Sequence, residues 1–264
     1  MPQFCVVFRL AIFSLLSCFV SSTSAHAQQA CQEVKVSGHA NLPPLSWYAN
    51  DTLHGAGMMA LRKILAKENI RIIPVEPGSP QRLTKALKEG RVDITLTATN
   101  EVVDLRTVNL IAPTLYTTNY LVLVRKDSDH VPQSWDDLKS LRGVVPRELD
   151  LGNSFEKFAE KNLPISRVHR AQQGLLMLKA KRVDYAIYPL IQADLLVSLY
   201  NYEGTLRKAP VEISSQDFYL GVSKHIDCRL PLDRITAELQ NMHKGAEIDR
   251  LANDALYQWM GLHL

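Results

Sequence analysis

The sequence lacks an apolar run long enough to span a membrane. The run at residues 10–20 has 11 residues, whereas a spanning helix needs about 20. One basic residue, Arg9, precedes this run, and small residues follow it in an A-x-A pattern at Ala25 and Ala27. This layout predicts a secretory signal peptide over residues 1–27, which is removed on export.

Cysteine is scarce, with four in the chain, and two of them, Cys5 and Cys18, fall within the predicted leader. Residues 15–18 also loosely match a lipoprotein cleavage box, so acylation of Cys18 is an open alternative. The other two, Cys31 and Cys228, are interpreted as a disulfide because exported proteins fold in an oxidising compartment. Two free thiols are the alternative.

Metal-binding and nucleic-acid-binding patterns are also missing. Neither HExxH nor CxxC occurs and the eight histidines are scattered, so we expect no metal and no cofactor. Removal of the leader leaves 29 basic residues against 27 acidic ones, because Arg9 is its only charged residue. No dense basic run with interleaved aromatics occurs, so we expect no nucleic-acid partner.

One short pattern is present twice. Residues 91–93, Arg-Val-Asp, recur 91 positions later as residues 182–184. A helical pattern precedes each copy and a short apolar run follows it. We interpret each copy as the turn between a helix and the next strand, where Asp93 and Asp184 bond nearby backbone amides. The repeat therefore indicates two similar halves, and we expect no catalytic role for its aspartates.

The halves read as two βαβαβ units, which predict parallel α/β sheets. Strand patterns lie at residues 33–38, 71–77, 92–98, 119–127, 143–149, 166–171, 183–190 and 216–224, and helical patterns at 58–70, 79–90, 134–143, 153–162, 172–181, 230–243 and 246–260. Two such lobes leave a cleft at the carboxyl ends of their strands, where ligands bind in open α/β sheets.

Several segments occur in an order typical of one family. They are "LPPLSWY", "GAGMMALRKILAKENI", "LTKALKEGRVDITLTATN", "NYLVLVRK" and "DDLKSLRG". In this order the chain resembles the periplasmic solute-binding proteins of family 3, the type II binding proteins of polar amino-acid ABC transporters. The resemblance implies an α/β, two-lobed type II periplasmic-binding-protein fold, with a ligand cleft between the lobes. Two crossing strands, near residues 121–127 and 214–220, would form the hinge.

The resemblance also implies domain boundaries. Lobe 1 would be discontinuous, comprising residues 28–122 and 218–264, and lobe 2 would comprise residues 123–217. A disulfide between Cys31 and Cys228 would then lie within lobe 1. The family usually works as a monomer in the periplasm, and we expect the same here.

Ligand-binding residues are carried over from the family position by position. An aromatic after the first strand, Trp47 or Tyr48, would pack on the ligand. After the third strand the family has a threonine followed three residues later by a carboxylate-binding arginine. This chain has Thr97 and Thr99, but valine at 102, so the nearest arginine is Arg106.

The second lobe matches the family in one place and departs from it in another. Small polar residues at a helix start, Gly152, Asn153 and Ser154, would offer backbone amides to the ligand's carboxylate. Pro189 stands where the family commonly has an acid for the ligand's ammonium group. The acids of the family's segment before the first helix are missing as well. The aromatics, among them Trp47, Tyr116, Tyr188 and Tyr219, suggest an aromatic, cyclic or merely carboxylated ligand.

The function that the resemblance implies is binding, not catalysis. The protein would capture an amino acid or related carboxylate and deliver it to an ABC permease in the inner membrane. One alternative is an exported enzyme similar to cyclohexadienyl dehydratases, in which Glu148, Glu156 or His169 would act as general acid. The other is a sensory or orphan binding protein without a transporter of its own.

Overall fold

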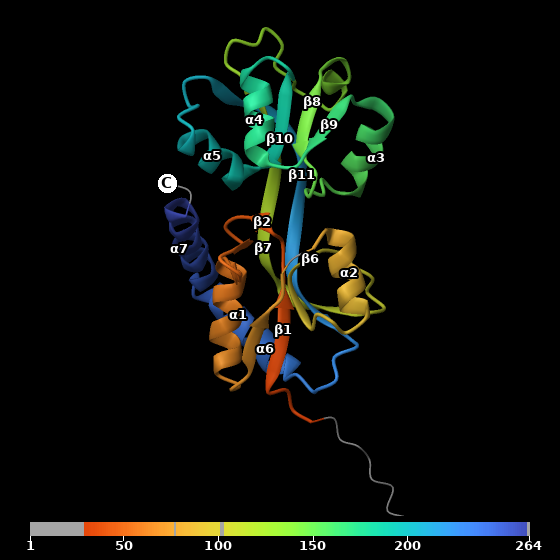
Figure 1. Ribbon diagram of the computed structural model, residues 1–264, viewed down its shortest axis with the longest axis vertical. Helices are drawn as coiled ribbons and strands as arrows, with labels where there is room; N and C mark the ends of the chain where they lie inside the picture. The colour runs from red at the N-terminus through yellow and green to blue at the C-terminus, as the bar shows by residue number, and fades with distance from the viewer. Residues whose placement is uncertain (1–28, 77, 101–102, 263–264) are drawn as a thin grey trace, which may run out of the picture.

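The computed structural model describes residues 29–76, 78–100 and 103–262 (Figure 1). The predicted signal peptide lies outside the described residues, and so does Cys18. No helix within the described ranges combines the length and apolar character that a membrane crossing requires.

The chain alternates strands and helices as the sequence predicted. The strands are β1 Glu33–Ser37, β2 Asn41–Leu42, β3 Ser46–Ala49, β4 Thr52–His54, β5 Arg71–Pro74, β6 Ile94–Ala98, β7 Val108–Arg125, β8 Gly143–Pro146, β9 Ile165–Val168, β10 Tyr185–Pro189 and β11 Leu206–Ser223. The helices are α1 Ala56–Ala66, α2 Pro80–Lys88, the 3-10 helix η1 Asp136–Ser140, α3 Asn153–Asn162, α4 Ala171–Lys179, α5 Leu190–Leu199, α6 Leu232–Lys244 and α7 Glu247–Gly261.

Two strands of 18 residues each, β7 and β11, run antiparallel through the length of the molecule (Figure 1). They join two parallel groups into one eight-stranded sheet of order β5-β1-β6-β11-β7-β10-β8-β9. β6 pairs with β11 at residues 219–222, and β10 pairs with β7 at residues 120–124. Each group forms the centre of one lobe, and the predicted two-lobed α/β architecture is confirmed.

Local sequence signals explain where α2 begins and ends. The Ser79 side chain accepts a hydrogen bond from the Arg82 backbone N–H at 3.3 Å, and Pro80 occupies the first turn. After the helix, Gly90 adopts a φ of +66°. A Cβ at this position would lie 3.0 Å from the His225 carbonyl oxygen, so both backbone conformation and space favour glycine.

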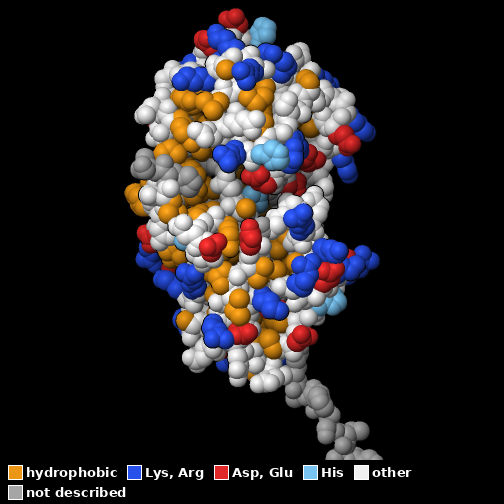
Figure 2. All heavy atoms as spheres, in the orientation of Figure 1, with side chains coloured by type: hydrophobic (Ala, Val, Ile, Leu, Met, Phe, Trp, Pro, Cys, Tyr) orange, Lys and Arg blue, Asp and Glu red, His pale blue; other side chains and the backbone are white. Residues whose placement is uncertain are grey.

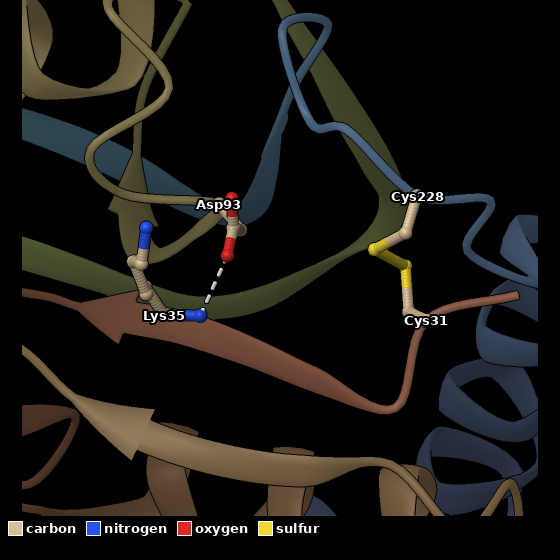
Figure 3. Close-up of a disulfide and its surroundings, with 4 residues drawn as sticks. All are labelled: Cys31, Lys35, Asp93 and Cys228. Atoms are coloured by element: carbon tan, nitrogen blue, oxygen red, sulfur yellow. Dashed lines mark hydrogen bonds between the residues drawn. A yellow bond between two sulfur atoms is a disulfide. The ribbon is translucent and has the colours of Figure 1, made fainter. Parts of the chain in front are cut away.

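The repeated aspartates connect the first and third strands of each βαβαβ unit. In lobe 1 the Asp93 carboxylate accepts from the Lys35 N–H at 2.7 Å (Figure 3). The Asp93 N–H in turn donates to the Lys35 carbonyl at 2.9 Å. In lobe 2 Asp184 and Arg142 form the same pair of bonds, at 2.9 and 2.8 Å. The predicted amide bonds exist, but they reach across to a neighbouring strand and do not stay within the turn.

Cys31 and Cys228 form the predicted disulfide, with Cα atoms 4.9 Å apart and a sequence separation of 197 (Figure 3). Next to it, the Cys31 N–H donates to the Arg229 carbonyl at 3.2 Å. The disulfide attaches the chain just before β1 to the segment that leads into α6.

Removal of the Asp93 carboxylate tests the structural interpretation of the repeat. Asp93→Ala leaves the Lys35 N–H without its acceptor, and we expect a loss of about 1–2 kcal/mol in the free energy of unfolding. Urea denaturation would measure it, with Asp129→Ala, in an exposed loop, as the control. Unchanged stability together with lost solute binding would instead point to a functional aspartate.

Reduction of the disulfide should destabilise the protein strongly. A loop of this length constrains the unfolded chain, and the chain-entropy account expects about 4–5 kcal/mol from it. The urea midpoint of wild type should fall on addition of dithiothreitol. The double variant Cys31→Ala/Cys228→Ala should start from the low midpoint and not respond to the reductant. Equal midpoints with and without reductant in wild type would contradict the expectation.

Candidate functional site

A cavity lies between the two lobes beside the long strands, with about 700 Å³ of empty space, part of it open to solvent. Only about 70 Å³ of this space admits the centre of a water-sized molecule, so a small-molecule site of about 300–1,000 Å³ would also need the neighbouring, more open space between the lobes. We call this first cavity the inner cavity. Its polar lining residues are His39, Thr84, Thr95, Thr97, Thr99, Tyr120, Glu148, Asp150 and Gln216. Both lobes and both long strands therefore contribute polar groups to one space.

A wider, more open cavity adjoins the first, and we call it the outer cavity. The two share Ala40, Gly78, Thr84, Glu148 and Asp150, and the outer one adds, among others, Arg147, Asn153, Glu156 and Arg167. Figure 2 shows the hollow between the lobes, with acidic side chains gathered at its edge on the lobe 2 side. The cavities lie where the carboxyl ends of β1, β6 and β8 face each other, as expected for parallel α/β sheets.

One hydrogen bond crosses the cleft beside the inner cavity. His39, directly after β1 in lobe 1, has its Nε2 3.3 Å from the Glu148 carbonyl oxygen in lobe 2. Its Nδ1 accepts from the Asn41 N–H at 3.0 Å, so Nε2 carries the hydrogen and donates to Glu148. Desolvation lowers the pKa of His39, more than the bond to Glu148 raises it. The neutral imidazole therefore connects the two lobes.

The Glu148 carboxylate is half-buried and lines both cavities. Burial raises its pKa, against smaller opposing effects of its own backbone amide and of His169. Among the described residues no cation lies within ion-pair distance of it, since it takes part in none of the ion pairs found there. A desolvated carboxylate of this kind favours a positively charged or hydrogen-bond-donating neighbour.

The long strands present an amide to the inner cavity. Tyr120 on β7 donates its hydroxyl to Gln216 Oε1 on β11 at 3.1 Å. Burial raises the pKa of Tyr120, so its hydroxyl stays protonated as the donor. Gln216 is 6% exposed, and its Nε2 has no hydrogen-bond partner among the described residues. This leaves a buried donor at the cavity wall.

The two arginines of the outer cavity differ in their surroundings. Arg167 binds both carboxylate oxygens of Glu156, at 2.6 and 2.8 Å, and donates to the Leu149 carbonyl at 3.0 Å. Arg147 is exposed, and its one hydrogen bond to a described residue runs from its backbone N–H to the Val168 carbonyl at 2.8 Å. The charge of Arg167 is thus largely compensated, whereas the guanidinium of Arg147 faces solvent.

The structure places some of the predicted site residues at these cavities. Thr97 and Thr99 line the inner cavity and Asn153 the outer one. Gly152, with φ +83°, and Ser154 flank Asn153 at the start of α3. Thr97, Thr99 and Asn153 therefore line adjoining cavities, whereas Gly152 and Ser154 line neither of them. The role of all five in ligand binding stays a prediction.

The predicted aromatics lie elsewhere. Trp47 and Tyr48 line a third cavity together with His169, and Trp47 stacks on His54 with ring centroids 5.7 Å apart. Tyr188 is buried and donates to the Ala171 carbonyl at 2.7 Å, so it packs inside lobe 2. Tyr116 lies on β7 outside both main cavities, where burial raises its pKa to about 12.

Arg106, the predicted carboxylate clamp, lines neither main cavity. Its side chain is 89% exposed and forms a salt bridge with Asp104 at 2.9 Å. This bond holds the pKa of Asp104 down at about 2. The geometry lends Arg106 no support as a ligand contact.

Sequence reasoning missed His39, Tyr120, Asp150 and Gln216, which meet at the inner cavity. His39 had a usable signal, because it directly follows the first strand of a parallel sheet. Tyr120 and Gln216 had none, since their contact depends on the pairing of β7 with β11. Glu148 and Glu156, considered only as acids of an enzyme, do line the cavities. Within the described ranges no group of three or more potential ligands is placed to hold a metal ion.

Comparisons with known proteins support the fold. Neither a family model nor a curated protein sequence matches the chain. The ligand-binding core of GluR0 in complex with L-glutamate superposes with a TM-score of 0.71 at 16% identity, covering 85% of this chain and 98% of that one. An amino acid ABC transporter substrate-binding protein from Streptococcus pneumoniae, bound to L-arginine, superposes with a TM-score of 0.66 at 16% identity. The match covers 86% of this chain and 95% of that one.

A third solved structure is a histidine kinase sensor domain with similarity to periplasmic binding proteins. It gives a TM-score of 0.66 at 19% identity and covers 86% of this chain and 96% of that one. These likenesses extend over both lobes. The chain has the two-lobed fold of the type II periplasmic binding proteins.

The His39 bond predicts a dependence of stability on pH. Because the pKa of His39 in the folded protein lies below its ordinary value of 6.5, the unfolded chain binds more protons around that pH. The stability contributed by neutral His39 is therefore present above pH 6.5 and is lost as the pH falls toward the lowered pKa. Urea denaturation at about pH 7.5 and about pH 5.5 would measure the loss.

Two glutamine variants separate His39 from the other histidines. His39→Gln keeps a donor for Glu148 but does not titrate, so it should reduce the loss of stability at acidic pH. His130→Gln, at an exposed position, should leave the loss of stability at acidic pH unchanged. An equal loss in wild type and His39→Gln would contradict the assignment.

Proposed function

We propose that this protein is an exported solute-binding protein that closes its lobes on a small polar solute and delivers it to an ABC-type transporter. The observation that carries the proposal is the inner cavity, whose polar groups come from both lobes and from both connecting strands. A solute there would touch both lobes at once, so binding would favour the closed arrangement by hinge motion about β7 and β11.

The domain boundaries follow the same proposal. Lobe 1 comprises residues 28–122 and 218–264, and lobe 2 comprises residues 123–217. The disulfide favours an oxidising compartment, the periplasm, after removal of residues 1–27. Of the structures with this fold, one is described as a transporter's substrate-binding protein bound to L-arginine, and another as a ligand-binding core with L-glutamate. An amino acid or a related small solute is the corresponding ligand class here, bound by a monomer.

The residues that we propose to contact the solute come from opposite sides of the cleft. Thr97 and Thr99 offer hydroxyls from the end of β6. Asn153 and Ser154 offer backbone amides from the start of α3, where the helix dipole favours partial negative charge on the ligand. The Gly152 N–H, the third predicted amide, already donates to Asp150 Oδ1 at 2.9 Å.

A sensory role is the main alternative on the same cleft, because one structure with this fold is a histidine kinase sensor domain. An enzyme is a further candidate, since the raised pKa of the half-buried Glu148 suits a general acid. Turnover of prephenate, measured on the purified chain, separates an enzyme from a binding protein. Binding without turnover supports the proposed function.

The experiment that tests the proposal is a thermal-shift screen of residues 28–264 with the disulfide intact. The panel contains the common amino acids, simple carboxylates, amines and prephenate. A ligand at 100 times its Kd should stabilise the protein by about 2.7 kcal/mol, which raises Tm by several degrees. No shift with any member of the panel would contradict the proposed function.

Two variants then locate the site with the ligand found in the screen. Thr97→Val removes one hydroxyl from the inner cavity at constant shape, and we expect Kd to rise about five- to tenfold. Arg106→Ala should leave Kd unchanged, because Arg106 is exposed and paired with Asp104. Isothermal titration calorimetry measures both. A large loss in Arg106→Ala would restore the arginine clamp expected from the sequence.

A further inference from the structure

The charged groups of the inner cavity have one sign. Glu148 and Asp150 line it, and among its described lining residues there is no lysine or arginine. His39 adds no positive charge at neutral pH, because burial lowers its pKa and its Nδ1 already accepts a bond from Asn41. An anionic group placed in this space would therefore meet the Glu148 carboxylate, which forms no ion pair with a described residue.

The Glu148 carboxylate is the group of the inner cavity that most strongly favours a positively charged ligand. It is half-buried, it belongs to both cavities, and no ion pair within the described ranges neutralises it. Because a desolvated carboxylate is stabilised by a nearby positive charge, a cationic group beside it is the favourable occupant.

Gln216 gives a second, independent indication. Its Nε2 lies at the wall of the same cavity, is buried, and has no partner among the described residues, whereas its Oε1 is taken by Tyr120. An unpaired buried amide donor is costly, so a ligand that supplies an acceptor oxygen removes that cost. With two carboxylates in the same space, a neutral oxygen suits this position better than a charged one.

The arginines do not reverse this conclusion. Arg167 is occupied by Glu156 and by the Leu149 carbonyl, and Arg106 is away from the cleft. Arg147 lines the outer cavity but not the inner one, so a carboxylate could reach it only at the mouth of the site. The inner cavity thus has no counterpart of a clamp for an α-carboxylate.

We propose that the inner cavity takes a small organic cation, an amine or guanidinium, that also carries a neutral acceptor oxygen and needs no α-carboxylate. The inference rests on the proposed solute-binding function and names its substrate class. The cationic group lies beside Glu148, and the neutral oxygen accepts from Gln216 Nε2.

Isothermal titration calorimetry with four probes tests it on residues 28–264. The probes are L-argininamide, L-arginine, N-acetylputrescine and L-glutamate. The first two have the same skeleton, but L-argininamide carries a neutral carboxamide where L-arginine carries a carboxylate. We expect L-argininamide to bind about tenfold or more tightly than L-arginine, N-acetylputrescine to bind, and L-glutamate not to bind.

Matched variants assign the two contacts. Glu148→Gln should weaken both cationic ligands about tenfold or more, whereas Glu160→Gln, exposed on α3, should change neither. Gln216→Leu should bring the Kd values of N-acetylputrescine and putrescine together, because only the acetylated amine offers an oxygen. A fold check by circular dichroism accompanies each variant, and the ratio of the two Kd values is independent of the fraction of folded protein.

The outcomes separate this inference from the proposed function. If L-glutamate binds, or if L-arginine binds more tightly than L-argininamide, the inference fails while solute binding stands. If neither cationic probe binds but another member of the earlier panel does, the inference fails again. If nothing in either panel binds, both fail.

Discussion

The antiparallel pairing of β7 with β11 is the constraint on which the rest of the structure depends. Each strand is long enough to serve both lobes, and their register runs from Arg125 opposite Leu206 to Val108 opposite Ser223. Since each lobe adds its parallel strands to one side of this pair, the carboxyl ends of both groups face one cleft. The same two strands also place Tyr120 and Gln216 at the wall of the inner cavity, so the hinge and the binding surface share residues.

One apolar cluster contains buried residues of both lobes, among them Leu42 and Leu196, whereas the hydrogen bonds that cross the cleft are few among the described residues. The His39–Glu148 bond is one of them, and Gln192 Nε2 in α5, 3.4 Å from the Asn41 carbonyl, is another. A net contribution of about 1 kcal/mol from each such bond is small enough for a solute to compete with or add to it.

Each lobe, by contrast, is held together locally. The Asp93–Lys35 and Asp184–Arg142 pairs connect the first and third strands of their units, and the disulfide adds a covalent link within lobe 1. The repeated turn, the βαβαβ units and the cysteine pair were predictable, because they depend on short-range patterns and on composition. The long strands were predicted too short: β7 begins at Val108 and β11 at Leu206, about ten residues earlier than expected. Helix α5, Leu190–Leu199, was missed, since its apolar residues show no helical face.

The sequence by itself determined the fold class and the two halves, because hydrophobic periodicity, caps and turn residues act over a few positions. The family resemblance also pointed to Thr97, Thr99 and the start of α3, whose role in ligand binding stays a prediction. Only the tertiary structure decided which polar groups share the cleft. The burial of Trp47 and Tyr188 and the pairing of Arg106 with Asp104 were likewise visible only in the tertiary structure. The inner cavity joins residues up to 180 positions apart, from Gly38 to Phe218. Such contacts are set by strand pairing across the whole chain, which no local pattern encodes.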